Sequence, residues 1–136
     1  MAGYYRVWHP RDSRLALEAN GSMGFYSRYQ HDGIAYLQPR ESVDILRDGN
    51  LRIAPFLQQS LALDTNQQFY NNTLELIPGF EVGFRSLPGF AFRTQYVHGW
   101  YLPFHSNSVN PYGSTYNDFR FRLLLQKGLM LHKEVE

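Results

Sequence analysis

The segment from Leu74 to Arg85 reads Leu-Glu-Leu-Ile-Pro-Gly-Phe-Glu-Val-Gly-Phe-Arg, and its side chains alternate in character. Every second position carries an apolar side chain: Leu74, Leu76, Pro78, Phe80, Val82 and Phe84. The positions between them hold Glu75, Ile77, Gly79, Glu81, Gly83 and Arg85. Because successive side chains of a β-strand point to opposite faces, this pattern predicts a strand with one apolar face and one mostly charged or bare face.

Two later segments repeat the same alternation. In residues 90–102 one face carries Phe90, Phe92, Thr94, Tyr96, His98, Trp100 and Leu102, and the other carries Ala91, Arg93, Gln95, Val97, Gly99 and Tyr101. In residues 118–126 the apolar face is Phe119, Phe121, Leu123 and Leu125, set against Asp118, Arg120 and Arg122. Strands of about ten or more residues exceed the usual five or six of soluble sheets and match the roughly 9–11 that cross a bilayer at a tilt.

Turn chemistry divides the whole chain into hairpins. Residues that tolerate positive φ or preset a turn cluster at 20–22, 31–33, 47–50, 64–67 and 86–89. We therefore expect about eight strands, near residues 4–9, 14–19, 23–30, 34–38, 51–63, 68–85, 90–103 and 116–127. Residues 40–47 fit a helical turn as well as a strand. The predicted fold is a single all-β domain over residues 1–136, an antiparallel up-and-down β-barrel; a soluble β-sandwich or soluble barrel is the alternative.

Composition excludes several classes of function. Thirteen Lys and Arg against twelve Asp and Glu leave a formal charge of +1, which provides no electrostatic footprint for nucleic acid. The chain has no cysteine, so disulfides, thiolate metal sites and cysteine nucleophiles are excluded. The five histidines form no metal-ligand pattern, and we expect neither a metal nor a cofactor. Residues 1–14 lack the apolar core of a secretory signal, and we expect none there.

The charged face has two interpretations. In a membrane barrel the apolar face meets lipid, and the other face forms a narrow polar lumen whose charges neutralise one another. In a soluble sheet the same alternation places the apolar face inside and the charges in water. Periodicity alone leaves this choice open. The residues expected on the polar lumen or charged face are Glu75, Glu81, Arg85, Arg93, Arg120 and Arg122.

The stretch from Pro78 to Leu125 resembles the closing hairpins of a Gram-negative outer-membrane β-barrel. Within that class, residues 79–85, 93–102 and 110–120 resemble the C-terminal barrels of exopolysaccharide-export and phage-adsorption outer-membrane proteins. The resemblance covers about a third of the chain and lies in alternation and turn chemistry. It implies an outer-membrane location, the lipid bilayer or envelope proteins as partners, and polysaccharide as a candidate cargo. An eight-stranded barrel is filled by its own side chains and would not conduct a polymer alone.

The longest predicted loop, residues 104–115, and the end of the strand before it hold the remaining candidate site residues. Aromatic side chains near strand ends can form interfacial girdles or stack on sugars. The candidate binding residues are Trp100, Tyr101, His105 and Tyr112. The run His105-Ser106-Asn107 is similar to the motif of outer-membrane lipid A deacylases, in which His lies two residues before the nucleophilic Ser. Here the two are adjacent, and on a strand they would point to opposite faces.

We therefore expect a non-enzymatic outer-membrane-type barrel, a structural, transport or surface-receptor element of a cell-envelope assembly. A soluble all-β subunit of a virion, filament or extracellular assembly is the first alternative. An outer-membrane lipid A hydrolase that uses His105 and Ser106 is the second. The oligomeric state stays open.

Overall fold

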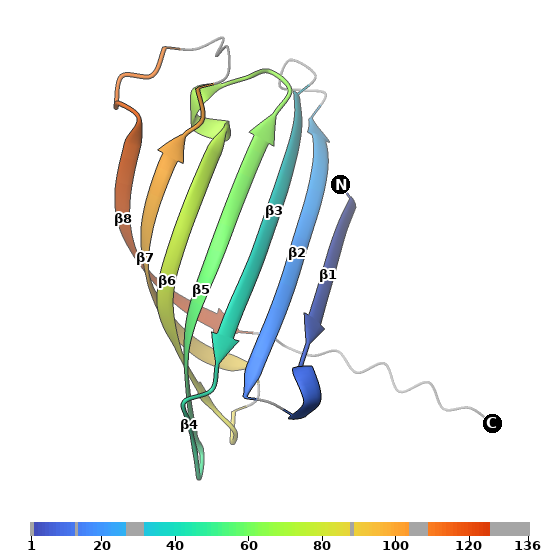
Figure 1. The fold of residues 1–136 in the computed structure, drawn as a ribbon, viewed down its shortest axis with the longest axis vertical. Coiled ribbons are helices and arrows are strands. Elements are labelled where there is room, and N and C mark those ends of the chain that lie inside the picture. Colours follow the sequence, from blue (N-terminus) through green and yellow to red (C-terminus); the bar gives the residue numbers. More distant parts are fainter. Residues whose placement is uncertain (1, 13, 27–31, 88, 104–108, 126–136) are drawn as a thin grey trace, which may run out of the picture.

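One antiparallel sheet contains all the strands of the computed structural model, which describes residues 2–12, 14–26, 32–87, 89–103 and 109–125 (Figure 1). Seven strands follow one another along its main path: β1 (Ala2–Trp8), β2 (Leu15–Tyr26), β3 (Asp32–Val43), β5 (Leu51–Asp64), β6 (Thr73–Phe84), β7 (Phe90–Tyr101) and β8 (Thr115–Leu125). The short β4 (Leu46–Asp48) pairs with the start of β5. Two 3₁₀ turns, η1 (Pro10–Asp12) and η2 (Phe69–Asn71), lie in connections.

The sheet is up-and-down, since neighbours on the main path pair antiparallel throughout. The prediction of an all-β antiparallel fold is confirmed. Closure into a barrel is not seen in the described part of the chain, where β1 and β8 are the two edges of the sheet. The sheet curves strongly, so that one face is concave and the other convex (Figure 1).

The prediction of a turn at residues 20–22 is wrong. Residues 14–19 and 23–30 were expected to be separate strands, but β2 runs without a break from Leu15 to Tyr26. Each residue of the supposed turn pairs with β3, Asn20 with Gln38 and Gly21 with Leu37. Ladder pairing on both sides, with β1 as well as β3, supplies hydrogen bonds that outweigh the local turn preference of Asn-Gly.

The expected start of a strand at residue 68 is also wrong, because residues 69–71 form η2. The side chain of Asn72 donates to Asp64 Oδ1 at 3.0 Å and to the Gln68 carbonyl at 2.9 Å, while its Oδ1 accepts from the Asp64 amide at 3.1 Å. Asn72 and Asp64 are both buried, so these bonds fix the connection between β5 and β6. The ambiguous residues 40–47 are extended, within β3 to Val43 and within β4 from Leu46.

Burial across the sheet is inverted relative to an ordinary soluble protein. Polar and charged side chains of the concave face are buried, among them Arg40, Glu81 and Gln95, each no more than 8% exposed. Large apolar side chains of the convex face are exposed: Phe80 is 55% exposed and Phe121 is 64% exposed. The apolar residues that alternate along β6, β7 and β8 therefore form the outer surface of the curve, not a core.

A small apolar cluster lies within the concave face. Phe56, Ile77 and Val97 are almost fully buried, and Tyr116 packs against them. Two glycines make room for these rings. A Cβ at Gly79 would overlap the Phe56 ring and the Thr94 carbonyl, and one at Gly99 would overlap the ring of Tyr116, its cross-strand partner.

The close approach of Tyr116 to Gly99 makes a testable prediction. Gly99→Ala should lower the free energy of unfolding by about 1–3 kcal/mol, because the added methyl must displace a packed ring. Urea denaturation of the folded protein measures this change. Gly83→Ala is the matched control, since a Cβ there meets nothing closer than 4.0 Å. Equal stability of the two variants would contradict the packing described for Gly99.

Candidate functional site

A polar trough of about 610 Å³ follows the concave face. Each of the seven strands of the main path contributes to its lining. Its charged residues are six arginines and three glutamates: Arg40, Arg52, Arg85, Arg93, Arg120, Arg122, Glu18, Glu75 and Glu81. We refer to this surface as the concave trough.

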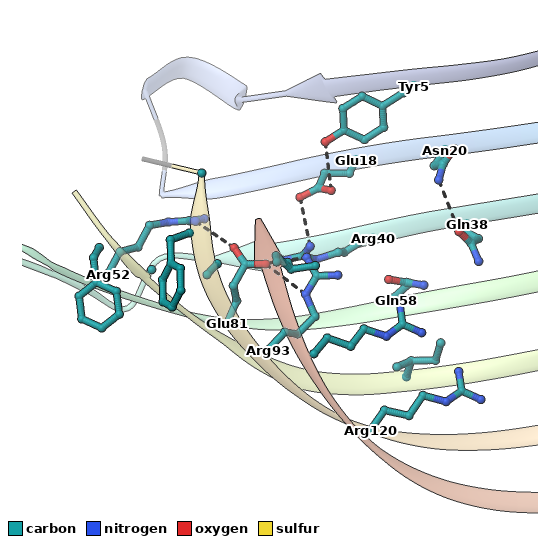
Figure 2. A pocket seen from close by; sticks show the side chains of 18 of the residues that line it. Tyr5, Glu18, Asn20, Gln38, Arg40, Arg52, Gln58, Glu81, Arg93 and Arg120 are labelled. Atoms are coloured by element: carbon teal, nitrogen blue, oxygen red, sulfur yellow. Dashed lines mark hydrogen bonds and ion pairs between the residues drawn. The ribbon is translucent and has the colours of Figure 1, made fainter. Parts of the chain in front are cut away.

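Glu81 is the acceptor at the centre of the trough (Figure 2). Its Oε2 accepts from Arg93 Nη2 at 2.6 Å and from Arg40 Nη2 at 2.9 Å, and its Oε1 accepts from Arg52 Nη1 at 3.1 Å. The three arginines come from β7, β3 and β5, while Glu81 lies on β6. One carboxylate therefore ties four strands together through charge-assisted hydrogen bonds.

The arginines around Glu81 have further partners. Arg52 Nε donates to Asp44 Oδ1 at 2.6 Å, and Arg40 Nη1 lies 3.7 Å from Glu18 Oε1. The Arg40 guanidinium also lies over the Phe56 ring, with its carbon 4.4 Å from the ring centroid. Arg40 is 6% exposed, and its Nε has no hydrogen-bond partner. Desolvation of this cation is costly, so its stability at this position depends on the carboxylates and the ring around it.

A second ion-pair group lies further along the trough. Glu75 Oε1 accepts from Tyr116 Oη at 2.8 Å and from Arg120 Nη2 at 3.3 Å. Arg120 Nε donates to Asp118 Oδ2 at 2.6 Å, and this pair is more exposed than those of Glu81. Together the two groups hold β6, β7 and β8 on the polar side of the curve.

All six residues expected on the charged face line the concave trough, including Arg85 and Arg122. Sequence reasoning missed the partners from the N-terminal half, Arg40, Arg52 and Glu18. A weaker signal was present, because the apolar residues Leu51, Ile53, Pro55 and Leu57 alternate with positions that include Arg52 and Gln58. Residues 51–63 were expected to form a strand, but the polar positions of that strand were not assigned to the charged face.

Of the candidate binding residues that the structure describes, Tyr101 and Tyr112 lie together and Trp100 has other neighbours. Tyr101 and Tyr112 lie around Phe69, with ring centroids 5.4 Å and 6.3 Å from its own. Trp100 instead packs edge-on against His98 at 4.4 Å, and His98 Nδ1 lies 2.7 Å from Asn117 Oδ1. His105, with the Ser106 and Asn107 that suggested a hydrolase, falls outside the described residues.

The part of the chain that the structure describes includes no group of three or more His, Asp or Glu side chains suited to a metal ion. It also includes no helix that is long and apolar enough to cross a membrane. The chemistry that the concave trough offers is electrostatic: fixed guanidinium groups, carboxylates that neutralise most of them, and a set of neutral amides.

Comparisons with known proteins add no assignment. No family model, no curated protein and no solved structure matches this chain. The resemblance to outer-membrane export and adsorption proteins therefore stays a prediction from the residues.

Removal of the central carboxylate tests the ion-pair network. Glu81→Gln should lower the free energy of unfolding by about 3–5 kcal/mol, because it leaves buried arginines without their counter-charge. Denaturant titration of the folded protein measures the loss. Asp118→Asn is the control: it removes a carboxylate from an exposed pair, and we expect little change. A Glu81→Gln protein as stable as the parent would show that the network does not hold the strands together.

Proposed function

We propose that this chain forms part of the wall of an outer-membrane-type β-barrel, with the convex face in lipid and the concave trough facing the lumen. In this role it is a non-enzymatic structural, transport or surface-receptor element of a cell-envelope assembly. The observation that carries the proposal is the inverted burial, since buried charges line the inside of the curve and exposed apolar side chains cover the outside.

The convex face is too apolar to be left in water. Phe80, Phe92, Phe119, Phe121 and Leu123 belong to adjacent strands, and each is at least 40% exposed. Phe92 and Phe121 stack with their centroids 6.2 Å apart, so the side chains form a continuous surface. Contiguous apolar surface of this kind marks contact with lipid or with another protein.

Strand length and aromatic placement favour lipid. β6 and β7 each have 12 residues, and a strand of that length measures about 40 Å, or about 28 Å across a bilayer at a tilt of about 45°. Phe84 and Phe90 meet at one end of these strands, where they also border the trough, and Trp100 lies near the other end. Aromatic girdles at both interfaces, with an apolar band of about 25 Å between them, are typical of transmembrane barrels.

Placement in a bilayer requires that the edges of the sheet be paired. Lipid offers no hydrogen bonds to an open edge, so β1 and β8 would each need a neighbouring strand. Seven antiparallel strands leave β1 and β8 running in the same direction. An antiparallel barrel therefore requires an odd number of further strands between these two edges.

Charge on the convex face tests the proposal. We expect Phe80→Arg and Phe92→Arg to abolish membrane assembly, because a lipid-facing arginine near the bilayer midplane costs about 2–4 kcal/mol. The measurement is membrane fractionation, followed by gel mobility of the detergent-extracted protein with and without boiling. The parent should fractionate with membranes and migrate differently before boiling.

Phe80→Leu is the control, since it keeps the face apolar and should assemble as the parent does. Normal membrane insertion of both arginine variants would contradict the assignment of this face to lipid. A parent protein that is soluble without detergent and shows no mobility shift would instead favour the assembly subunit, in which the convex face packs against a neighbouring protein.

A further inference from the structure

The concave trough carries more positive charge than its own carboxylates neutralise. Of its six arginines, Arg40, Arg52, Arg93 and Arg120 form ion pairs with trough or neighbouring carboxylates. Within the described part of the chain, Arg85 and Arg122 have no carboxylate partner. Both are exposed to the space of the trough.

The position of Arg122 makes its lack of a partner informative. It lies directly opposite Arg93 in the register of β7 and β8. Like charges at a cross-strand pair destabilise a sheet, and Arg93 is already compensated by Glu81 at 2.6 Å. A second arginine at this position adds repulsion that no carboxylate among the described residues offsets. An anion bound in the trough next to Arg122 would supply the missing counter-charge.

Arg85 and Arg122 occupy different levels of the trough. Arg93 and Arg122 lie at the level of Glu81 in the sheet register, whereas Arg85 is the residue directly after β6, four positions beyond Glu81. Four residues of extended chain span about 13 Å. Two unneutralised cations at this separation fit an extended anion better than a single small ion.

The opposite wall of the trough has different chemistry. Asn20, Gln38 and Gln58 come from β2, β3 and β5 and line the trough (Figure 2), whereas Arg85 follows β6 and Arg122 lies on β8. Asn20 donates to Gln38 Oε1 at 3.4 Å, and Gln38 donates to Ser60 Oγ at 3.2 Å. Gln58 has no hydrogen-bond partner among the described residues, so both its amide donor and its amide acceptor remain available. Neutral amides of this kind hydrogen-bond hydroxyl groups.

We propose that the concave trough binds an extended, carboxylate-bearing carbohydrate. Arg85 and Arg122 bind its carboxylates, because the guanidinium fork matches carboxylate geometry bidentately. The side-chain amides of Asn20, Gln38 and above all Gln58 bind its hydroxyl groups. The inference deepens the proposed function and rests on it, since it assigns a ligand class to the surface that would face the lumen.

The experiment uses the full chain folded in detergent and three probes of similar length: an oligogalacturonate, a neutral malto-oligosaccharide and a linear polyphosphate. Calorimetric titration measures the affinity for each. We expect oligogalacturonate to bind more tightly than either of the other two probes. Its affinity should fall as the salt concentration is raised. Arg122→Gln and Arg85→Gln should each weaken its binding roughly tenfold, the loss of about one charge-assisted hydrogen-bonded contact.

Arg6→Gln is the matched control, because Arg6 does not line the trough and instead lies over Trp8, with its guanidinium carbon 5.0 Å from the ring centroid. The Arg6→Gln protein should bind oligogalacturonate with the same affinity as the parent. Gln58→Ala should weaken the binding of oligogalacturonate but leave any binding of polyphosphate unchanged.

Unchanged oligogalacturonate affinity in both arginine variants, or equal affinity for the neutral oligosaccharide, would overturn the proposal. Tighter binding of polyphosphate with no effect of Gln58→Ala would overturn the carbohydrate assignment. Membrane fractionation of the same protein reports separately on the proposed function. A membrane-inserted protein that binds no probe would thus refute the assigned ligand class. A protein that is soluble without detergent would refute the placement of the trough in the lumen of a membrane barrel.

Discussion

The structure depends on the carboxylate of Glu81, which accepts hydrogen bonds from arginines of three other strands. Without it, Arg40 and Arg93 would lie close together on a buried surface with no adequate counter-charge. With it, the concave face can be charged and buried at once, and the apolar side chains are left to cover the convex face. The inverted burial, the trough and both functional proposals follow from this arrangement.

The sequence was sufficient for the strands whose alternation is strongest. The apolar and charged positions of residues 74–85, 90–102 and 118–126 predict β6, β7 and β8 and assign every one of their side chains to a face. It was not sufficient where strand pairing overrides a local preference. Asn20 and Gly21 favour a turn, but both lie within β2. The contacts of Arg40 and Arg52 with Glu81 join residues 41 and 29 positions apart, which no local pattern reports.

Which face of the sheet lies inside could not be predicted from periodicity, because the alternation is the same in a membrane barrel and in a soluble sheet. Curvature is what resolves which face is inside. The charged side chains lie on the inside of the curve, where they reach one another across strands, and the exposed side chains of Phe80, Phe92 and Phe121 lie on the outside. A polar interior of this type suits a ligand held by charge and hydrogen bonds and not by apolar contact. Placement in a membrane then requires above all that the open edges at β1 and β8 be paired with further strands.

Accessibility of two adjacent residues in the middle of β8 tests the central claim most directly. The chain has no cysteine, so Phe121→Cys and Arg122→Cys each introduce a single thiol, one on the convex face and one in the trough. A charged, water-soluble maleimide is applied to each variant in lipid vesicles. The account predicts that Arg122→Cys is labelled and Phe121→Cys is protected, with both labelled after the protein is denatured. Rapid labelling of Phe121→Cys in vesicle-bound protein would place the convex face in water and contradict it.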